Sequence, residues 1–310
     1  MFGVCSCYFE TFGYFWGLVL IFVTIRGVYS VLKNHGLLPK KSVKGEHVFI
    51  TGGGNGIGRL MSIILAKQGA KVTVSDINKE WAEETAKMIT EKGGEAIAVQ
   101  CDVTSVEQIS ESAKTARESF GDVTILINNA GIVSGKKILE ISHKLAEKTL
   151  QVNTLAHIYT VKEFLPSMIK KNHGHIVSIA SSAGLVGCPG LVDYCASKYG
   201  AVGFDESLRL EMKKIGANIY TTCICPTFIK TDMFKGAKTI EAIIPLLEPD
   251  WIAERIVTAI RQNEPMLMTP FISNTGYLTR AILPSYFLDI YFKLLGINES
   301  MDDFIGRNKD

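Results

Sequence analysis

The chain has 310 residues, of which 33 are lysine or arginine and 31 are aspartate or glutamate. The net charge of +2 argues against a protein that coats nucleic acid, because such proteins carry a clear basic excess. With 47% hydrophobic and 21% charged residues, the composition also excludes a disordered or collagen-like chain. This length fits one large α/β domain or two smaller ones.

The seven cysteines are odd in number and scattered, so they do not form the framework of a disulfide-stabilised protein. They include no C-x-x-C pair and no cysteine–histidine cluster with zinc spacing, and the six histidines are also dispersed. We therefore expect reduced thiols in a cytosolic redox environment and no metal site.

The first strongly apolar feature is residues 11–32, a stretch of 22 residues with Arg26 as its single charge. About 20 apolar residues are needed to cross the hydrocarbon core of a bilayer. The mean hydropathy of the chain, +0.19, is also high for an enzyme without a membrane segment. Tyr14, Trp16 and Tyr29 are typical of the aromatic residues at membrane interfaces. The sequence therefore predicts an N-terminal membrane anchor helix.

Lysines follow this segment, because Lys33, Lys40, Lys41 and Lys44 all lie on its C-terminal side. By the positive-inside rule that side faces the cytosol. A cleaved signal peptide fits poorly, since residues 1–9 carry no positive side chain and no small-residue cleavage site follows. A buried helix of the globular domain, a helix lying in the membrane interface and a hairpin anchor are the alternatives.

From Glu46 onward, short apolar segments alternate with helical ones. The predicted strands are residues 47–51, 71–75, 95–101, 124–128, 175–180, 218–224 and 266–268. The predicted helices are residues 57–68, 79–92, 105–120, 143–171, where Pro166 is expected to perturb the helix, and 194–214. This alternation predicts an α/β fold with a Rossmann-type, doubly wound parallel sheet.

A glycine-rich loop with the sequence TGGGNGIG, residues 51–58, lies between the first predicted strand and the first predicted helix. Glycine lets the backbone approach a pyrophosphate closely, and the helix N-terminus adds free N–H groups and a positive dipole end. Asp76 ends the second strand, where a carboxylate bonds a ribose and repels a 2′-phosphate. No arginine or lysine occurs between Gly52 and Gly58, so the loop favours NAD over NADP. An ordinary glycine-rich turn is the alternative.

Tyr194 and Lys198 share one face of a predicted helix, because they are four residues apart. A lysine ammonium favours the phenolate of a nearby tyrosine and so lowers its pKa, which suits the tyrosine to proton exchange with an alcohol. The same spacing occurs in Tyr29 and Lys33 at the end of the apolar segment. Only the pair at Tyr194 follows a strand that ends in serines, residues 181–182, so it is the candidate catalytic pair.

These segments together resemble the short-chain dehydrogenase/reductase family over about residues 45–269. The motifs that carry the resemblance are the glycine loop, Asn128-Asn129-Ala130-Gly131, Asn153, Ser181 and Tyr194-xxx-Lys198. Three segments, ILINNAGIVSGKK, GLVDYCASKYGAVGF and CPTFIKTDMF, resemble its membrane-bound branch, which includes retinol dehydrogenases and lipid-droplet 17β-hydroxysteroid dehydrogenases.

The resemblance implies an NAD-dependent enzyme that oxidises a lipophilic alcohol, first of all all-trans-retinol to all-trans-retinal. A 17β-hydroxysteroid or another lipid alcohol is the alternative substrate, and a non-catalytic membrane or lipid-droplet scaffold is the alternative of another class. The resemblance further implies contact with membrane lipid and the formation of a homo-dimer. It also implies a location on the endoplasmic reticulum membrane or on lipid droplets, with the catalytic domain in the cytosol. The intact catalytic motifs speak against the scaffold.

The resemblance also assigns roles to individual residues. Tyr194 would be the general acid/base, and Lys198 would lower its pKa and hold the nicotinamide ribose. Ser181 would polarise the substrate, and Asn153 would hold a water of the proton relay. The residues assigned to the cofactor are Gly52, Asn55, Gly56, Ile57, Gly58, Asp76, Asp102, Val103, Asn129, Ala130, Gly131, Tyr194, Lys198 and Thr231. Thr227 follows Pro226 where many relatives have glycine, a departure that touches no catalytic group.

We expect three parts along the chain: residues 1–44 as membrane anchor and basic linker, residues 45–270 as the dehydrogenase domain, and residues 271–310 as an apolar C-terminal extension. Residues 228–249 lie where the family keeps a mobile lid over the substrate. This stretch and residues 265–297 are rich in apolar and aromatic side chains, which suit either a lipid alcohol arriving from a bilayer or ordinary packing.

Overall fold

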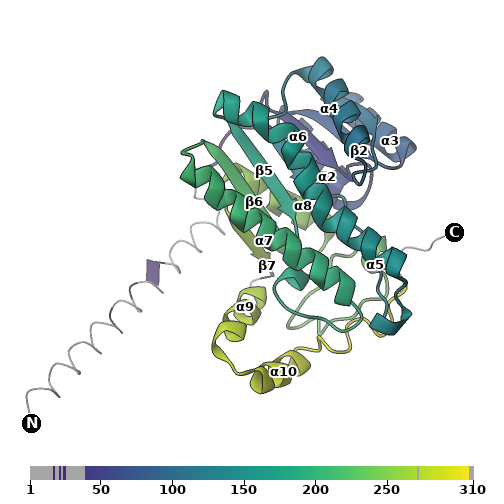
Figure 1. Ribbon diagram of the computed structural model, residues 1–310, viewed down its shortest axis with the longest axis vertical. Coiled ribbons are helices and arrows are strands. Elements are labelled where there is room, and N and C mark those ends of the chain that lie inside the picture. Colours follow the sequence, from purple (N-terminus) through teal and green to yellow (C-terminus); the bar gives the residue numbers. More distant parts are fainter. Residues whose placement is uncertain (1–16, 18–20, 22–23, 26–38, 271, 307–310) are drawn as a thin grey trace, which may run out of the picture. The chain divides into compact units, whose positions relative to one another are not determined.

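The structure, a computed structural model, describes residues 17, 21, 24–25, 39–270 and 272–306 (Figure 1). Of the predicted membrane segment only Gly17, Ile21, Thr24 and Ile25 are described, all of them helical. The rest of that prediction, with the Tyr29–Lys33 pair, lies outside the described residues. Among the helices that the structure describes, none combines the length and the apolar character needed to cross a membrane. Residues from Ser42 onward form one compact unit, separate from the residues before it.

A parallel sheet of seven strands runs through this unit in the described part of the chain. The strands are β1 (His47–Thr51), β2 (Lys71–Asp76), β3 (Glu95–Gln100), β4 (Ile125–Asn128), β5 (Gly174–Ile179), β6 (Ile219–Pro226) and β7 (Met266–Thr269). Their order in the sheet is β3-β2-β1-β4-β5-β6-β7, which confirms the expected Rossmann-type fold. The chain direction across the sheet reverses between β1 and β4, and such a reversal leaves a crevice at the carboxyl ends of the strands.

Helices cover both faces of the sheet (Figure 1). On one face lie α2 (Gly56–Lys67), α3 (Lys79–Thr90) and α8 (Pro249–Arg261), and on the other lie α4 (Val106–Phe120), α5 (His143–Leu150), α6 (Ala156–Lys171) and α7 (Val192–Lys214). The side-chain oxygens of Asn55, Asn78, Ser105 and Ser142 accept backbone N–H groups at the N-termini of α2, α3, α4 and α5. These caps satisfy donors that the helices leave free, so they set where each helix begins.

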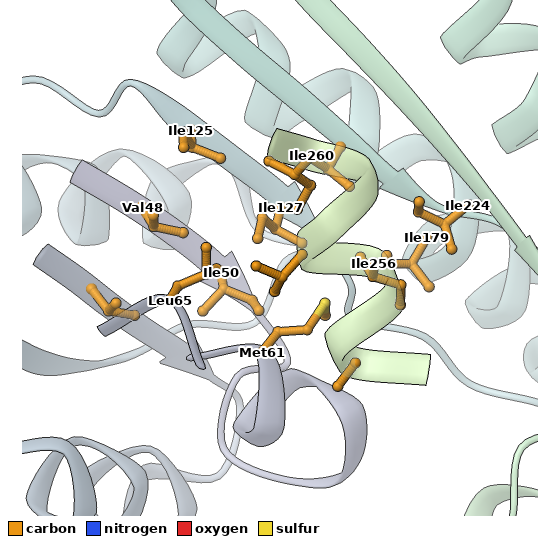
Figure 2. Close-up of a cluster of buried hydrophobic side chains, with 14 of the residues drawn as sticks. Val48, Ile50, Met61, Leu65, Ile125, Ile127, Ile179, Ile224, Ile256 and Ile260 are labelled. Atoms are coloured by element: carbon orange, nitrogen blue, oxygen red, sulfur yellow. The ribbon is translucent and has the colours of Figure 1, made fainter. Parts of the chain in front are cut away.

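Branched side chains hold the sheet and its helices together, as Figure 2 shows for the face under α2 and α8. Ile50 and Ile127 point from neighbouring strands β1 and β4 toward Met61 of α2 and Ile256 of α8, and all four side chains are fully buried. Truncating one such isoleucine to alanine costs about 2–5 kcal/mol of stability. This packing fixes the carboxyl ends of β1 and β4, which carry the glycine loop and Asn129.

The helical region predicted at residues 143–171 is interrupted, but not at Pro166. That proline lies inside α6, while a π-helical turn, Gln151–Leu155, separates α5 from α6. Bonds to α7 hold this turn, because Thr154 Oγ1 donates to the carbonyl of Ser197 at 2.7 Å. The change of winding therefore lies at the turn that bonds α7, and α6 continues through Pro166.

The C-terminal extension forms two short helices, α9 (Ile272–Ile282) and α10 (Ser285–Leu294), which lie beyond the end of β7 (Figure 1). Residues 297–306, here called the C-terminal strap, then pair with the loop at residues 235–238. Within this pairing Lys238 N–H donates to the carbonyl of Ser300 at 2.9 Å, and Ile305 N–H donates to the carbonyl of Lys235 at 2.9 Å. The extension thus packs against the loops at the carboxyl end of the sheet.

Candidate active site

The glycine loop makes a turn that tolerates no side chains at its closest points. Gly52 and Gly56 adopt positive φ angles of 60° and 54°. A Cβ atom on Gly58 would lie 2.1 Å from the carbonyl oxygen of Gly52, and one on Gly52 would lie 2.9 Å from Cα of Ala130. The loop therefore places bare backbone and the N-terminus of α2 at the crevice, as a bound diphosphate requires.

Asp76 is fixed at the end of β2 by the backbone around it. Its Oδ2 accepts the N–H of Gly54 at 3.0 Å, and its Oδ1 accepts the N–H of Asn78 at 3.0 Å. Only 7% of the residue is exposed. Arg59, the cation beside the loop, donates to the carbonyl of Gly54 at 2.9 Å and pairs with Glu84. Asp76 thus presents a rigid carboxylate at the cavity described next.

A single cavity lies between the glycine loop and α7, here called the glycine-loop cavity. All fourteen residues assigned to the cofactor from the sequence line it: Gly52, Asn55, Gly56, Ile57, Gly58, Asp76, Asp102, Val103, Asn129, Ala130, Gly131, Tyr194, Lys198 and Thr231. Glycine backbone, a ribose-binding carboxylate and apolar walls together fit a nicotinamide dinucleotide.

Sequence reasoning missed other residues of the same wall. Lys148 of α5 lines the cavity, where its Nζ pairs with Asp102 Oδ2 at 3.2 Å and donates to Thr104 Oγ1 at 2.9 Å. No motif marks this lysine, because it reaches the cavity only through the packing of α5. The wall also includes Ile77, Trp81, Cys101, Ile132, Val152, Ile179, Ala180, Pro226, Thr227, Ile229, Met233 and Phe234.

Asn129 ties the end of β4 to the glycine loop. Its Nδ2 donates to the carbonyls of Thr51 and Gly52 at 3.0 and 2.9 Å. In return Thr51 Oγ1 accepts the backbone N–H groups of Asn129 and Ala130, each at 3.0 Å. These four bonds hold the two strand ends on either side of the topological reversal at a fixed spacing. Asn129 therefore shapes the floor of the cavity as well as lining it.

Tyr194 and Lys198 meet as predicted, one turn apart on α7, and both are buried. Lys198 Nζ lies 5.6 Å from the centre of the Tyr194 ring and donates to the carbonyl of Ile179 at 2.7 Å. Burial raises the pKa of Tyr194, against a smaller lowering by the hydroxyl of Ser181, and burial lowers the pKa of Lys198 to about 8. The expected lowering of the tyrosine pKa is therefore not seen here, because burial penalises the phenolate.

Ser181 lies where the sequence placed it, beside Tyr194. Its Oγ accepts the N–H of Ala183 at 3.1 Å and donates to the carbonyl of Pro226 at 3.4 Å. The hydroxyl also reaches Tyr194, whose pKa it lowers. Ser181 lines the glycine-loop cavity and the apolar pocket described below, whereas Ser182 lines only that pocket. The structure thus distinguishes the two serines as the spacing did.

Asn153 occupies the π-helical turn, fully buried. Its Oδ1 accepts the N–H of Ile132 at 2.9 Å, and its Nδ2 donates to the Ile132 carbonyl and to Ser197 Oγ, both at 2.9 Å. Both amide hydrogens are thus committed to the fold. Among the described residues that line the two cavities, Asn153 does not occur. A water held by this residue would therefore bond its main chain or Oδ1 rather than receive a hydrogen bond from its side chain.

A second, apolar pocket adjoins the glycine-loop cavity. It is roofed by α9, α10 and the C-terminal strap, and it measures about 840 Å³ when its open mouth is included. Its walls are Ser181, Ser182, Ala183, Leu185, Val186, Cys188, Leu191, Tyr194, Thr227, Phe228, Phe234, Thr239, Ile244, Ile272, Ser273, Gly276, Phe292, Leu295, Gly296, Ile297 and Ser300. Four residues line both spaces: Ser181, Tyr194, Thr227 and Phe234. Tyr194 therefore stands where the two spaces join.

Some residues of the stretch expected to form a substrate lid, residues 228–249, line the apolar pocket, and others pack in the core. Phe228, Phe234 and Ile244 line the apolar pocket, and the Phe234 ring packs edge-on against Tyr194 with the ring centres 6.0 Å apart. Leu247 belongs instead to the buried core under α8. Both alternatives left open by the sequence, substrate contact and ordinary packing, thus occur within one segment.

A glycine loop on a parallel sheet, with a tyrosine, a lysine and a serine beside an apolar pocket, defines a nucleotide-dependent dehydrogenase. The family model described as short chain dehydrogenase matches residues 46–241. The chain belongs to this family, and it is accordingly an oxidoreductase that acts on CH–OH donors. Members of the family normally use NAD or NADP.

Relatives match most of the chain. Human epidermal retinol dehydrogenase 2 is 45% identical over 276 residues, which cover 87% of this chain and 89% of the relative. The mouse protein of that name is 40% identical and covers 94% of this chain and 96% of its own length. Retinol dehydrogenase 10 of Xenopus tropicalis is 39% identical, with 87% of each chain covered.

Proposed function

We propose that this protein uses NAD to oxidise a lipophilic alcohol, and that all-trans-retinol, oxidised to all-trans-retinal, is its substrate. The observation that carries the proposal is the shared position of Tyr194 and Ser181, which line both the glycine-loop cavity and the apolar pocket. An alcohol in the apolar pocket would meet these two hydroxyls beside a nicotinamide in the other space. The retinol dehydrogenases among the relatives support the substrate class.

The proposed roles follow from the chemistry of alcohol oxidation. A bound NAD would supply the hydride acceptor for the carbinol carbon. The phenolate of Tyr194 takes the hydroxyl proton as the C=O bond of the product forms, and the hydroxyl of Ser181 hydrogen-bonds the reacting oxygen. Burial disfavours this phenolate, whereas the positive charge of an oxidised nicotinamide beside it would favour it. Lys198 faces the tyrosine ring, and burial lowers its pKa to about 8. Asn153 holds Ile132 and Ser197 in place beside this group.

The choice of NAD over NADP is part of the proposal, and Asp76 supports it. Its carboxylate is buried, held by two backbone N–H groups, and lines the glycine-loop cavity. Arg59, the cation beside the loop, is engaged by Glu84 and by the carbonyl of Gly54. A 2′-phosphate would therefore meet negative charge where a ribose hydroxyl would find an acceptor.

We further propose that residues 11–32 anchor the protein to the endoplasmic reticulum membrane or to lipid droplets, with the catalytic domain in the cytosol. The roof of the apolar pocket supports contact with lipid. Ile282, Tyr286 and Leu294 are each 70% exposed or more, whereas Phe292, on the same helix as Tyr286 and Leu294, lines the pocket. An alcohol that leaves a bilayer would thus meet the pocket beside these apolar side chains.

The test uses membranes from cells that express the full chain, supplied with NAD and all-trans-retinol. NADH fluorescence should rise together with chromatographically identified all-trans-retinal. Membranes with Tyr194→Phe serve as the matched control, and they should lose at least about 10²–10⁴-fold in turnover. Turnover of a 17β-hydroxysteroid but not of retinol would replace the substrate, and near-normal turnover by Tyr194→Phe would contradict the mechanism.

A further inference from the structure

Three hydroxyl groups of the apolar pocket lack a hydrogen-bond partner among the described residues, and one of them, Thr227 Oγ1, belongs to a residue that also lines the glycine-loop cavity. The other two, from residues that line the apolar pocket but not the glycine-loop cavity, are Oγ1 of Thr239, in the loop before α8, and Oγ of Ser273, in the first turn of α9. Both oxygen atoms are buried. Buried polar atoms in folded proteins are nearly always hydrogen-bonded, because a lost partner costs free energy. These two hydroxyls therefore point to a ligand group that bonds them.

Ser300, in the same pocket, has a hydroxyl that does have hydrogen-bond partners within the protein. Ser300 Oγ lies 2.8 Å from the carbonyl of Ile297, to which it donates, and 3.3 Å from the sulfur of Cys188. Its hydrogen-bonding capacity is used inside the protein. Thr239 and Ser273 thus differ from Ser300 in having no such internal use among the described residues, although all three line the pocket.

The two hydroxyls lie away from the reaction centre. Tyr194 and Ser181 line both the apolar pocket and the glycine-loop cavity, whereas Thr239 and Ser273 line only the apolar pocket. They also come from two different elements, the loop that the C-terminal strap holds through Lys238 and the helix that follows β7. A substrate whose alcohol reaches Tyr194 would therefore bring another part of its skeleton to these hydroxyls.

The chemistry of the pocket limits what that part can be. None of the described residues that line the pocket carries a charge, so a buried carboxylate or ammonium would find no partner there. A serine or threonine hydroxyl can donate to a ketone and can either donate to or accept from a hydroxyl. The second group is therefore a neutral oxygen.

We propose that the preferred substrate of this enzyme carries, besides the alcohol that is oxidised, a second neutral oxygen that Thr239 and Ser273 hold. This rests on the proposed function, which makes the apolar pocket the substrate site. Ring-oxidised retinoids and keto- or hydroxysteroid alcohols have such an oxygen. Unmodified retinol has its single oxygen at the reacting end, so it leaves both hydroxyls without a partner.

The expected difference in kcat/KM within a substrate pair follows from the net free energy of one neutral hydrogen bond. One such bond changes an equilibrium or a rate by about threefold to tenfold. The oxygen-bearing substrate should therefore show a kcat/KM about threefold to tenfold higher if one hydroxyl bonds it, and more if both do.

The test compares matched alcohols on membranes that contain the full chain. One pair is all-trans-retinol and all-trans-4-oxoretinol, which differ only at the ring; the other is a 17β-hydroxysteroid with and without a 3-ketone. The wild-type enzyme should prefer the ketone in at least one pair. Thr239→Val and Ser273→Ala should each lower the ratio of kcat/KM for that ketone to kcat/KM for the matched alcohol without the ketone by about threefold to tenfold. Ser300→Ala, whose hydroxyl is already engaged, should change both members of the pair equally.

The outcomes separate this proposal from the proposed function. Equal kcat/KM within both pairs, with retinol turned over normally, would overturn the second oxygen and leave the retinol dehydrogenase intact. Equal losses on both members of a pair in Thr239→Val and Ser273→Ala would also overturn it, since the hydroxyls would then serve only the fold. Absence of turnover with all four alcohols would refute the proposed function itself.

Discussion

Replacing Asp76 by asparagine tests the cofactor preference at one atom. The carboxylate is 7% exposed, and backbone N–H groups hold both of its oxygens at 3.0 Å, so it cannot turn away from a ligand. We take a separation of about 4 Å between this carboxylate and a 2′-phosphate that replaces the ribose hydroxyl, the distance of two charged groups in contact. For one unit charge on each group and an effective dielectric constant of about 20, the repulsion is about 4 kcal/mol. This corresponds to a preference for NAD of about 10³-fold in kcat/KM.

Asparagine keeps the shape of the side chain and one acceptor oxygen but removes the charge. We therefore expect Asp76→Asn to narrow the ratio of kcat/KM for NAD to that for NADP by about 10²–10³-fold, measured with one alcohol at fixed ionic strength. Asp102→Asn is the matched control, because Asp102 lines the same cavity and is paired with Lys148. That variant should leave the ratio nearly unchanged.

Two results would refute this reasoning about Asp76. The first is a wild-type enzyme that uses NADP as well as NAD. The second is an Asp76→Asn variant that keeps the wild-type ratio and the wild-type melting temperature, since the carboxylate would then be remote from the 2′ position of the ribose.

Other consequences of the structure are open to measurement. Ser181→Ala should lower kcat by about 10²-fold and Ser182→Ala by much less, because only Ser181 reaches Tyr194; equal losses would contradict the assignment. Burial raises the pKa of Asp205 from 3.8 to about 7. The stability that its protonated form contributes is complete below pH 4 and is lost as the pH rises through 7. Asp205→Asn should therefore flatten the fall of Tm between pH 5 and 8, and an unchanged slope would show that the carboxyl titrates elsewhere. Deleting residues 1–32 should release the protein from membranes in alkali, and alkali-resistant attachment of the truncated chain would overturn the proposed anchor. Protease added to sealed microsomes should digest the catalytic domain, and full protection without detergent would overturn the proposed orientation.

Local patterns were enough to predict the sheet and the glycine-loop cavity. Parallel strands bring their carboxyl ends to one edge, so the glycine loop, Asp76 and Asn129 had to gather there once the strands were recognised. The i, i+4 spacing likewise placed Tyr194 and Lys198 on one face of α7. In each case a short segment with its own period or motif determines the geometry.

Features that depend on packing between distant segments escaped prediction. The π-helical turn at Gln151–Leu155 is held by hydrogen bonds from its side chains to α7, and no local sequence pattern predicts it. The pKa of Tyr194 rises because the surrounding loops and helices bury it, which spacing to Lys198 does not reveal. Apolar composition marked the C-terminal extension, yet only the fold shows that it roofs a pocket and leaves Thr239 and Ser273 facing it.

The roof of the apolar pocket has an evolutionary consequence. The glycine loop, Asp76 and Asn129 come from the first half of the chain, whereas α9 and α10 follow the last strand, with α9 packed on β7 and α10 on α9. The terminal stretch supplies part of the wall of the apolar pocket and none of the residues that line the glycine-loop cavity. Its sequence can therefore change during evolution without changing the residues around the glycine loop. Grafting that stretch between relatives would alter this part of the pocket and leave the lining of the glycine-loop cavity as it is.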